Sequence, residues 1–365
     1  MKITTSIHAH VMVRKNILMN DRVAIFSDLH MGVHCNATLW HNTSKQWAKW
    51  FANELKSHNI SDVIFCGDFF HDRDFVSVDT MHAACDVLQE LSEFNLHMFP
   101  GNHDCFYKQH AGVNSLSILQ GWKNINIYHT PQSITTSGGY KFMLCPWGTI
   151  LEDIEQSDAV FGHFEIQTFK MNTFKLCDHG LTIRKLLDKS PLIFSGHFHF
   201  HEERLFEIGK IIYVGNPFQM DMNDSGNAKG YYIFDANNKS IDFYENKISP
   251  LLFKYKLSQI KNSAAGEDDL NNICNNICNN IIQFIVDEQL PEQELEDLKA
   301  KIKLCNPLEI EFIEDISMSI NNQKCTMNSD GIDIEQALIE FIDLMQYPHK
   351  NKLQEYALNI FRKYK

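Results

Sequence analysis

Short polar blocks that follow apolar runs constrain the fold of this chain more than any other feature of its sequence. Each run is rich in β-branched or aromatic residues, which predicts a buried strand that ends at a polar loop. Glycines lie beside most of the blocks and permit the tight turns that crowded polar side chains need. The five blocks are residues 28–30, 67–71, 101–104, 162–163 and 196–199, and the runs before them are residues 23–26, 63–66, 97–100, 159–161 and 192–194.

The polar side chains of these blocks are expected to meet at one edge of a sheet, because open α/β folds place functional groups at the carboxyl ends of their strands. They supply carboxylates, imidazoles and an amide, a mixed set that suits Mn²⁺, Fe²⁺ or Zn²⁺ better than Ca²⁺ or Mg²⁺. Two such ions about 3.5–4 Å apart can hold the attacking and leaving oxygens of a displacement at phosphorus. The pair needs a bridging carboxylate, and Asp68 is the natural candidate.

Any one block has an ordinary structural interpretation, such as a plain turn or a hydrogen-bonded buried histidine. Five blocks in one order, each at a predicted strand end, make coincidence a poor explanation. The sequence therefore predicts a site with two metal ions that cleaves phosphate esters.

Over roughly residues 20 to 220, the blocks resemble the signature of the calcineurin-like metallophosphoesterase superfamily. Within it, the chain looks most like the SbcD-type nuclease subunit of the DNA double-strand-break repair complex, especially its bacteriophage recombination endonuclease versions. His71 lies three residues after Asp68, where the protein phosphatases carry Asp-Arg-Gly instead. Residues 213–219 resemble the strand and loop that close the nuclease core, and the chain continues well beyond them.

The resemblance implies a role for each matched residue. One metal ion would be bound by Asp28, His30, Asp68 and His199, and the other by Asp68, Asn102, His163 and His197. The ions are predicted to be Mn²⁺.

Three further residues would act beside the metals. In the resembled enzymes a metal-bound hydroxide attacks phosphorus, and His103 would stabilise the transition state or protonate the leaving 3′ oxygen. Asp104 would orient His103 through a hydrogen bond. His71 would position the DNA phosphate or the scissile strand, unless it only orients a metal ligand.

The periodicity predicts an α/β fold. Apolar residues at helical spacing indicate helices at residues 43–58, with Thr43 as N-cap, and at residues 77–94. Later strands at residues 141–145, 211–214, 231–235 and 241–244 suggest a second, more antiparallel sheet. We therefore expect the two-sheet metallophosphoesterase sandwich flanked by helices, with a small α+β capping domain and a C-terminal helical hairpin.

Three domains are predicted: a nuclease core at residues 1–249, a DNA-orienting cap at 250–330 and a helical hairpin at 331–365. Strands are expected at residues 251–257 and 308–313 of the cap. Cys274 and Cys278 lack the further ligands of a metal site, so packing or tandem slippage of the repeated sequence is the better interpretation. The hairpin, broken at Pro348, could simply pack on the cap. The resemblance instead implies docking to the coiled-coil base of an SbcC-type, SMC-like ATPase.

Composition sets broader limits. The net charge of −13 argues against a protein that coats DNA, but not against a nuclease whose two divalent ions add positive charge at the substrate site. No segment approaches the roughly 20 apolar residues of a membrane span, and no signal peptide is recognised, so the expected location is the cytoplasm, or the host cytoplasm if a phage encodes the chain. Cys66 and Cys145 lie in apolar runs and are predicted to be buried, reduced thiols.

Three functions remain open. The first is a metal-dependent DNA nuclease, with 3′→5′ exonuclease and single-strand endonuclease activity, which serves recombination, replication and double-strand-break repair with the ATPase. The second is a phosphomonoesterase or nucleotide phosphodiesterase on the same core. The third is a non-catalytic scaffold, which the intact set of metal ligands disfavours. The resemblance also implies a homodimer formed through helices of the core.

Overall fold

The computed structural model describes residues 18–258, 275–288, 291–315, 334–344 and 350–363. The chain divides into two compact units, Met1–Glu314 and Asp315–Lys365.

The first six-stranded sheet carries three of the five blocks. Its strands lie in the order β12-β11-β1-β2-β3-β4, and β1 to β4 are parallel, whereas β11 and β12 each run antiparallel to their neighbour. Its members are β1 (Arg22–Phe26), β2 (Asp62–Phe65), β3 (Asn95–Met98), β4 (Ile125–Ile127), β11 (Gly230–Asp235) and β12 (Ser240–Glu245).

The second six-stranded sheet carries the other two blocks. It has the order β5-β6-β7-β8-β10-β9, with a parallel centre and an antiparallel strand at each edge. Its members are β5 (Gln132–Thr135), β6 (Lys141–Cys145), β7 (Ala159–His163), β8 (Leu192–Gly196), β9 (Glu202–Phe206) and β10 (Gly209–Tyr213).

The predicted membership of the second sheet is wrong for two strands. β6 and β10 lie there as expected, but β11 and β12 extend the first sheet, where β11 pairs with β1. The physical reason is that both faces of β11 are apolar and both are covered. Tyr231 and Ile233 pack with the helices, while Tyr232 and Phe234 face the other sheet.

Alternation along β1 shows how the layers form, because successive side chains of a strand point to opposite faces. Val23 and Ile25 enter the core between the two sheets, whereas Ala24 and Phe26 pack under the helices. A third cluster covers the outer face of the second sheet. The predicted sandwich flanked by helices is confirmed, and Cys66 and Cys145 are buried free thiols as expected.

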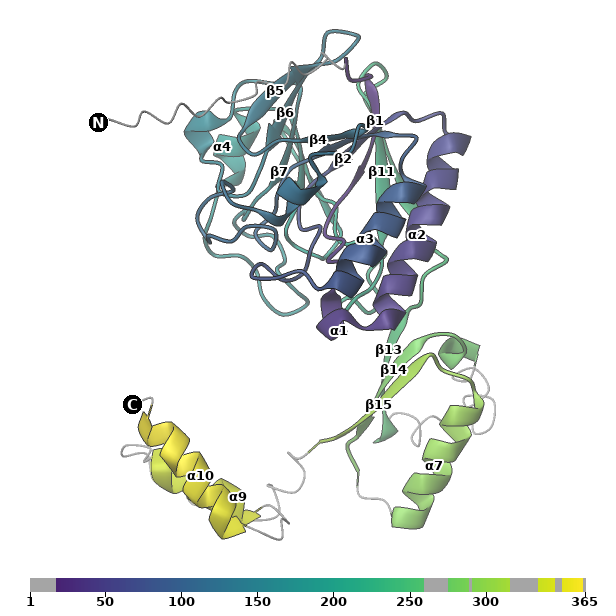
Figure 1. The fold of residues 1–365 in the computed structure, drawn as a ribbon, viewed down its shortest axis with the longest axis vertical. Helices are drawn as coiled ribbons and strands as arrows, with labels where there is room; N and C mark the ends of the chain where they lie inside the picture. Colours follow the sequence, from purple (N-terminus) through teal and green to yellow (C-terminus); the bar gives the residue numbers. More distant parts are fainter. Residues whose placement is uncertain (1–17, 259–274, 289–290, 316–333, 345–349, 364–365) are drawn as a thin grey trace, which may run out of the picture. The chain divides into compact units, whose positions relative to one another are not determined.

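Two long helices cover the first sheet and lie side by side (Figure 1): α2 (Thr38–Ser57) and α3 (Val78–Glu90). Ser77 caps α3, since its Oγ accepts from the Thr80 N–H at 3.1 Å. The predicted N-cap of α2 is wrong. The helix begins five residues before Thr43, whose hydroxyl donates to the Leu39 carbonyl inside the helix. The shorter helical segments of the core are α1 (Val33–Asn36), η1 (Ser115–Leu119), η2 (Leu151–Asp153) and α4 (Ile183–Leu187).

A small parallel sheet follows the core, in the order β13-β14-β15. Its strands are β13 (Leu252–Lys256), β14 (Ile281–Val286) and β15 (Glu309–Glu314), and α7 (Glu292–Leu304) packs on it through Ile302. The two strands predicted here are confirmed as β13 and β15. Of the two cysteines considered, Cys274 lies outside the described residues. The division into three functional domains stays a prediction.

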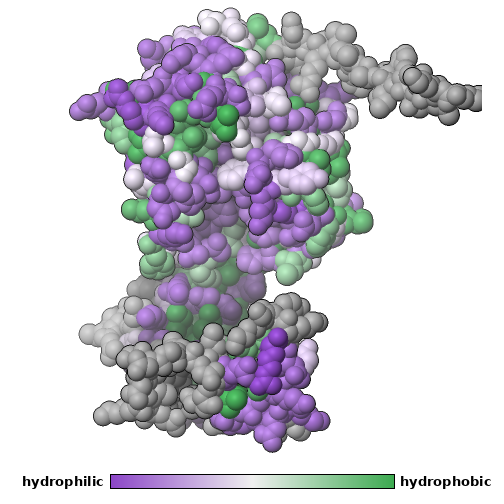
Figure 2. Space-filling model, turned by 90° about the vertical axis from the view of Figure 1, so that its left-hand side faces the viewer, coloured by the Kyte–Doolittle hydropathy of each residue, from purple (hydrophilic) through white to green (hydrophobic). Residues whose placement is uncertain are grey.

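The second unit contains α9 (Ile334–Leu344) and α10 (Lys350–Lys363). They pair as a hairpin, in which Arg362 Nη2 lies 2.6 Å from Glu335 Oε2 and Gln354 donates to Asp343 Oδ1 at 2.7 Å. Pro348 lies outside the described residues. No described helix is long and apolar enough to cross a lipid bilayer. On the face drawn in Figure 2, hydrophilic residues cover most of the surface and hydrophobic ones form small separate patches.

Candidate metal centre

The five polar blocks meet where the carboxyl ends of strands from both sheets come together. β1, β2 and β3 bring three blocks from the first sheet, and β7 and β8 bring two from the second. The expectation of a single sheet edge is therefore wrong, because the site needs both sheets. Hydrogen bonds link the blocks directly. The Asp28 N–H donates to the Gly67 carbonyl at 2.9 Å, and the His197 N–H donates to both oxygens of the Asp28 carboxylate.

One group of possible metal ligands contains Asp28, His30 and His199, whose ligand atoms all lie within 4.8 Å of one another. The Nε2 atoms of His30 and His199 are 2.9 Å apart. Asp28 is fully buried and His30 is almost so. Two imidazole nitrogens and a buried carboxylate that converge in this way are a suitable set for a divalent transition metal.

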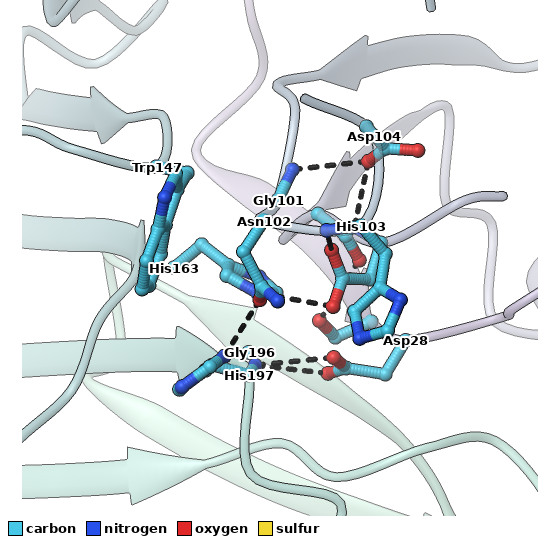
Figure 3. A network of polar contacts seen from close by, with 12 residues as sticks. Asp28, Gly101, Asn102, His103, Asp104, Trp147, His163, Gly196 and His197 are labelled. Atoms are coloured by element: carbon cyan, nitrogen blue, oxygen red, sulfur yellow. Dashed lines mark hydrogen bonds and ion pairs between the residues drawn. The ribbon is translucent and has the colours of Figure 1, made fainter. Parts of the chain in front are cut away.

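A second group lies beside it, in the network of Figure 3. Asn102 Oδ1 is 3.0 Å from His163 Nε2 and 2.7 Å from His197 Nδ1. Asp68, His163 and His197 also bring their ligand atoms within 4.8 Å of one another. The structure thus collects the seven predicted ligands into two adjacent clusters.

Asp68 lies between the two groups. Its Oδ2 is 3.7 Å from His30 Nε2 in the first group and 3.3 Å from His163 Nε2 in the second. Its Oδ1 accepts the His103 N–H at 2.7 Å. This position is the one that a carboxylate bridging two ions would occupy.

Burial and neighbouring charges shift the pKa values of the carboxylates and imidazoles in the site. Burial would raise the pKa of Asp68, but the attraction of His163, its hydrogen bond and the attraction of His30 and His103 together lower that pKa below its usual range. Burial likewise opposes protonation of His163, yet Asp68 raises its pKa to about 9. Burial, and then His199, lower the pKa of His30, and burial raises the pKa of Asp28. Buried carboxylates and imidazoles at this density call for a cation, since isolated buried charge is costly.

Backbone strain coincides with the ligands. Asp28, His30, Asp68 and His197 have φ angles of 53°, 48°, 61° and 89°, a region that residues other than glycine rarely adopt. Such conformations cost on the order of 1–3 kcal/mol each and cluster at functional sites. Close packing adds to this constraint, because a Cβ on Gly101 would clash with Asp68 Oδ1. The donor set and its enforced geometry fit a dinuclear metal centre.

His103 and His71 stack beside the first group, with ring centroids 5.5 Å apart. His103 Nδ1 must donate to the His71 carbonyl, 2.7 Å away, because a carbonyl only accepts. Nε2 is then the ring nitrogen that faces other partners, and no described residue hydrogen-bonds to it. His71 Nδ1 lies 3.4 Å from His30 Nδ1, so His71 contacts a possible ligand as well as the catalytic candidate.

Asp104 does not orient His103, contrary to the sequence-based expectation. Its buried carboxylate accepts from four backbone N–H groups, and Ser115 Oγ lies 3.3 Å from it. Burial and then Asp68 raise its pKa to about 6. The carboxylate therefore holds the turn that presents Asp68. The four N–H groups belong to Asp68, Phe69, Phe70 and Gly101.

We expect Asp104→Ala to reduce the free energy of unfolding by at least about 3 kcal/mol, because each unpaired buried donor costs about 1–3 kcal/mol. Urea unfolding in the presence of EDTA measures this without a metal contribution. Asp104→Asn, which keeps one acceptor oxygen, should be milder. Unchanged stability with lost activity would favour the original role beside His103 instead.

Two residues near the second group were missed by the sequence analysis. Glu165 Oε1 lies 3.5 Å from His197 Nε2, and hydrogen bonds from His197 and His179 lower its pKa to about 2. The Trp147 ring packs 5.1 Å from that of His197. Glu165 follows the 162–163 block by two residues, which is the only signal that could have identified it.

Glu165→Gln should lower the affinity for the metal ion held by His197 by roughly tenfold, because a carboxylate partner orients a ligand imidazole and raises its basicity. Calorimetric titration of the metal-free protein with MnCl₂ measures the change. The matched control is Glu155→Gln, which alters an exposed pair with Lys141 and should change nothing. Equal weakening of both ions would contradict a specific role for Glu165.

The chain is similar to known phosphoesterases. Residues 21–201 match the family described as calcineurin-like phosphoesterase. The chain is 28% identical over 237 residues to "Exonuclease subunit 1" of Enterobacteria phage T4, an alignment that covers 62% of this chain and 68% of that protein.

Solved structures of similar fold were also found. An archaeal phosphodiesterase has a TM-score of 0.35 and 14% identity, covering 62% of this chain and 99% of its own. GAP50, the anchor in the inner membrane complex of Plasmodium, has a TM-score of 0.44 and 15% identity, covering 64% and 86%.

The fold and the two ligand clusters define an enzyme of the metal-dependent phosphoesterase class. Residues 21–201 of the chain form a calcineurin-like phosphoesterase domain.

Proposed function

We propose that the protein is a DNA nuclease that hydrolyses phosphodiester bonds with two divalent metal ions. The observation that carries the proposal is the pair of ligand groups with Asp68 between them and His103 beside them. The similarity to the phage exonuclease subunit supports DNA as the substrate. Asp28, His30, Asp68 and His199 would hold one ion, and Asp68, Asn102, His163 and His197 the other.

When bound, the two ions would supply positive charge for the phosphate oxygens and lower the pKa of a water molecule. The protein's own side chains would bind the ions and act on the substrate. Asp68 would hold the two metal sites close together, and Asn102 and the ligand histidines would complete them. His103, once protonated, can offer Nε2–H to the leaving oxygen because its Nδ1 is already committed to the His71 carbonyl. His71, stacked on His103, would fix that ring and contact the strand being cut.

The metal is proposed to be Mn²⁺, on the mixed nitrogen and oxygen donor set. The biological setting proposed is recombination, replication and double-strand-break repair in the cytoplasm of the cell or host. The partner proposed for the α9–α10 hairpin is an SbcC-type ATPase. Both helices are amphipathic, and Phe341 and Tyr356 are exposed large side chains on them.

A homodimer is proposed to form through an apolar surface beside α3. A groove there is lined by Arg73, Met81 and several exposed apolar side chains. A second copy would cover them, and Ile118→Asp should shift the mass measured by light scattering from dimer to monomer. A monomeric wild type would reject this surface. The exposed apolar residues that line it are Phe75, Phe106, Val113 and Ile118.

The alternative is a phosphomonoesterase or nucleotide phosphodiesterase, since the same metal groups can serve small esters. The deciding experiment is digestion of an end-labelled duplex and of a single strand with Mn²⁺, beside bis-p-nitrophenyl phosphate. Metal-dependent loss of nucleotides from DNA supports the nuclease. Ester hydrolysis without any DNA cleavage, even with an ATPase partner added, would reject it.

A further inference from the structure

A buried ion pair lies next to the first ligand group but is not part of it. Lys229 Nζ is 2.7 Å from Asp224 Oδ1, and the two side chains are only 3% and 4% exposed. A buried pair of charges is rarely retained for stability alone, because removing both charges from water costs nearly as much as their attraction returns. The position of this pair suggests what it does.

The ammonium makes a second contact that reaches the metal centre. Lys229 Nζ donates to the carbonyl oxygen of His199 at 2.6 Å. Lys229 directly precedes β11 in the first sheet, whereas His199 follows β8 in the second. The contact therefore joins the two sheets at a residue that contributes a possible metal ligand.

The carboxylate of the pair organises the loop that leads to Lys229. Asp224 Oδ2 accepts from Asn216 Nδ2 at 2.9 Å and from the Met220 N–H at 2.9 Å. The same loop is hydrogen-bonded to the chain just after His199, since Asn227 Oδ1 accepts the His201 N–H at 2.9 Å. Lys229 is thus held in place before it reaches the His199 carbonyl.

His199 differs from the histidines of the second group in how it is oriented. His163 Nδ1 lies 2.7 Å from the Cys66 carbonyl, and His197 Nε2 lies near Glu165. Both rings therefore have a partner on the side away from the ligand cluster. Among the described residues, His199 Nδ1 makes no hydrogen bond, although a ring nitrogen of His199 and carboxylate oxygens of Asp221 and Asp224 lie within 4.8 Å of one another. The backbone of His199 is therefore one of the constraints on the orientation of its ring.

We propose that Lys229 and Asp224 are positioning residues that hold His199 through its carbonyl and so set the affinity of the first metal ion. The proposal rests on the ligand assignment made under the proposed function. It predicts an effect on one ion of the two, because in the described part of the chain neither Lys229 nor Asp224 forms a hydrogen bond or ion pair with the second group. The Lys229 ammonium acts through His199 and contacts no substrate.

The test is titration of the EDTA-treated full chain with MnCl₂, in which the paramagnetic resonance of free Mn²⁺ counts the bound ions. Wild type should bind two. Lys229→Met should bind one with unchanged affinity and the other roughly 10–100-fold more weakly. Lys229→Arg, which retains a cation and donors, should recover part of the loss. Lys141→Met, at an exposed pair with Glu155, is the matched control.

The double variant Asp224→Asn, Lys229→Met separates positioning from simple stability. It removes both charges, so urea unfolding should show it to be more stable than Lys229→Met. It still lacks the bond to His199, so its weak ion should remain weak. Recovery of tight binding in the double variant, or wild-type binding of both ions by Lys229→Met, would overturn the proposal. A wild type that binds fewer than two ions would reject the dinuclear assignment itself, and this inference with it.

Discussion

Replacing His103 by alanine should reduce DNA cleavage by about 10²–10⁴-fold, the usual contribution of a positioned general acid. The imidazole lies beside the first ligand group, 4.8 Å from His30 between ring centroids, and its ligand atom lies within 4.8 Å of those of His30 and His71, but His103 is not one of the seven proposed ligands. Both metal ions should therefore remain bound. Initial rates on an end-labelled strand, with metal content measured on the same preparation, check this expectation.

The choice of ester then reveals what His103 does. p-Nitrophenolate leaves readily without a proton, whereas the 3′ oxygen of DNA does not. If His103 protonates the leaving group, His103→Ala should retain far more activity on bis-p-nitrophenyl phosphate than on DNA. If it instead stabilises charge on the phosphoryl oxygens, both rates should fall together. Loss of metal from the variant would contradict both roles and make His103 a ligand.

Asp68→Asn should lower the affinity for both metal ions by more than about 100-fold. Loss of a carboxylate ligand should cost more than loss of a residue that orients a ligand, which typically lowers metal affinity 10–100-fold. The reason is that Asp68 Oδ2 faces His30 in one group and His163 in the other. Asp28→Asn, by contrast, should weaken one ion. Counting bound Mn²⁺ in both variants provides the comparison.

Thermal unfolding gives an independent measurement of the same variants. A ligand present at 100 times its dissociation constant stabilises the folded state by about 2.7 kcal/mol. Mn²⁺ should therefore raise the unfolding temperature of wild type clearly and that of Asp68→Asn hardly at all. If Asp68→Asn lost a single ion and kept its stabilisation by Mn²⁺, Asp68 would not bridge the two sites.

The strands and helices that carry the site were largely predictable from the sequence, because local rules determine them. The apolar runs before the blocks became β1, β2, β3, β7 and β8, since short β-branched and aromatic runs favour buried strands. The helices α2 and α3 followed from apolar residues at helical spacing, although Thr43 proved to be an interior residue. The two-sheet sandwich predicted from these strands and helices is also confirmed.

The assignment of strands to sheets was less predictable. β11 looks like any other apolar strand in the sequence, and its pairing with β1 depends on which surfaces remain uncovered after the rest has folded. Hydrogen-bond pairing of strands is a relation between distant segments, so no local pattern encodes it. Asp104 was unpredictable for the same reason. Residue type and spacing suggested a partner for His103, but the carboxylate accepts hydrogen bonds from the distant backbone N–H groups of residues 68–70.

The sequence by itself determined the chemistry of this protein: the carboxylates, imidazoles and amide, and their placement after strands. Only the tertiary structure decided how they are used. It placed Asp68 between the two groups, committed His103 Nδ1 to the His71 carbonyl, and brought Glu165 and Lys229 to the ligands. Residue type sets which atoms can bind a metal. Distance and orientation come from packing two sheets together, which no single segment of the chain contains.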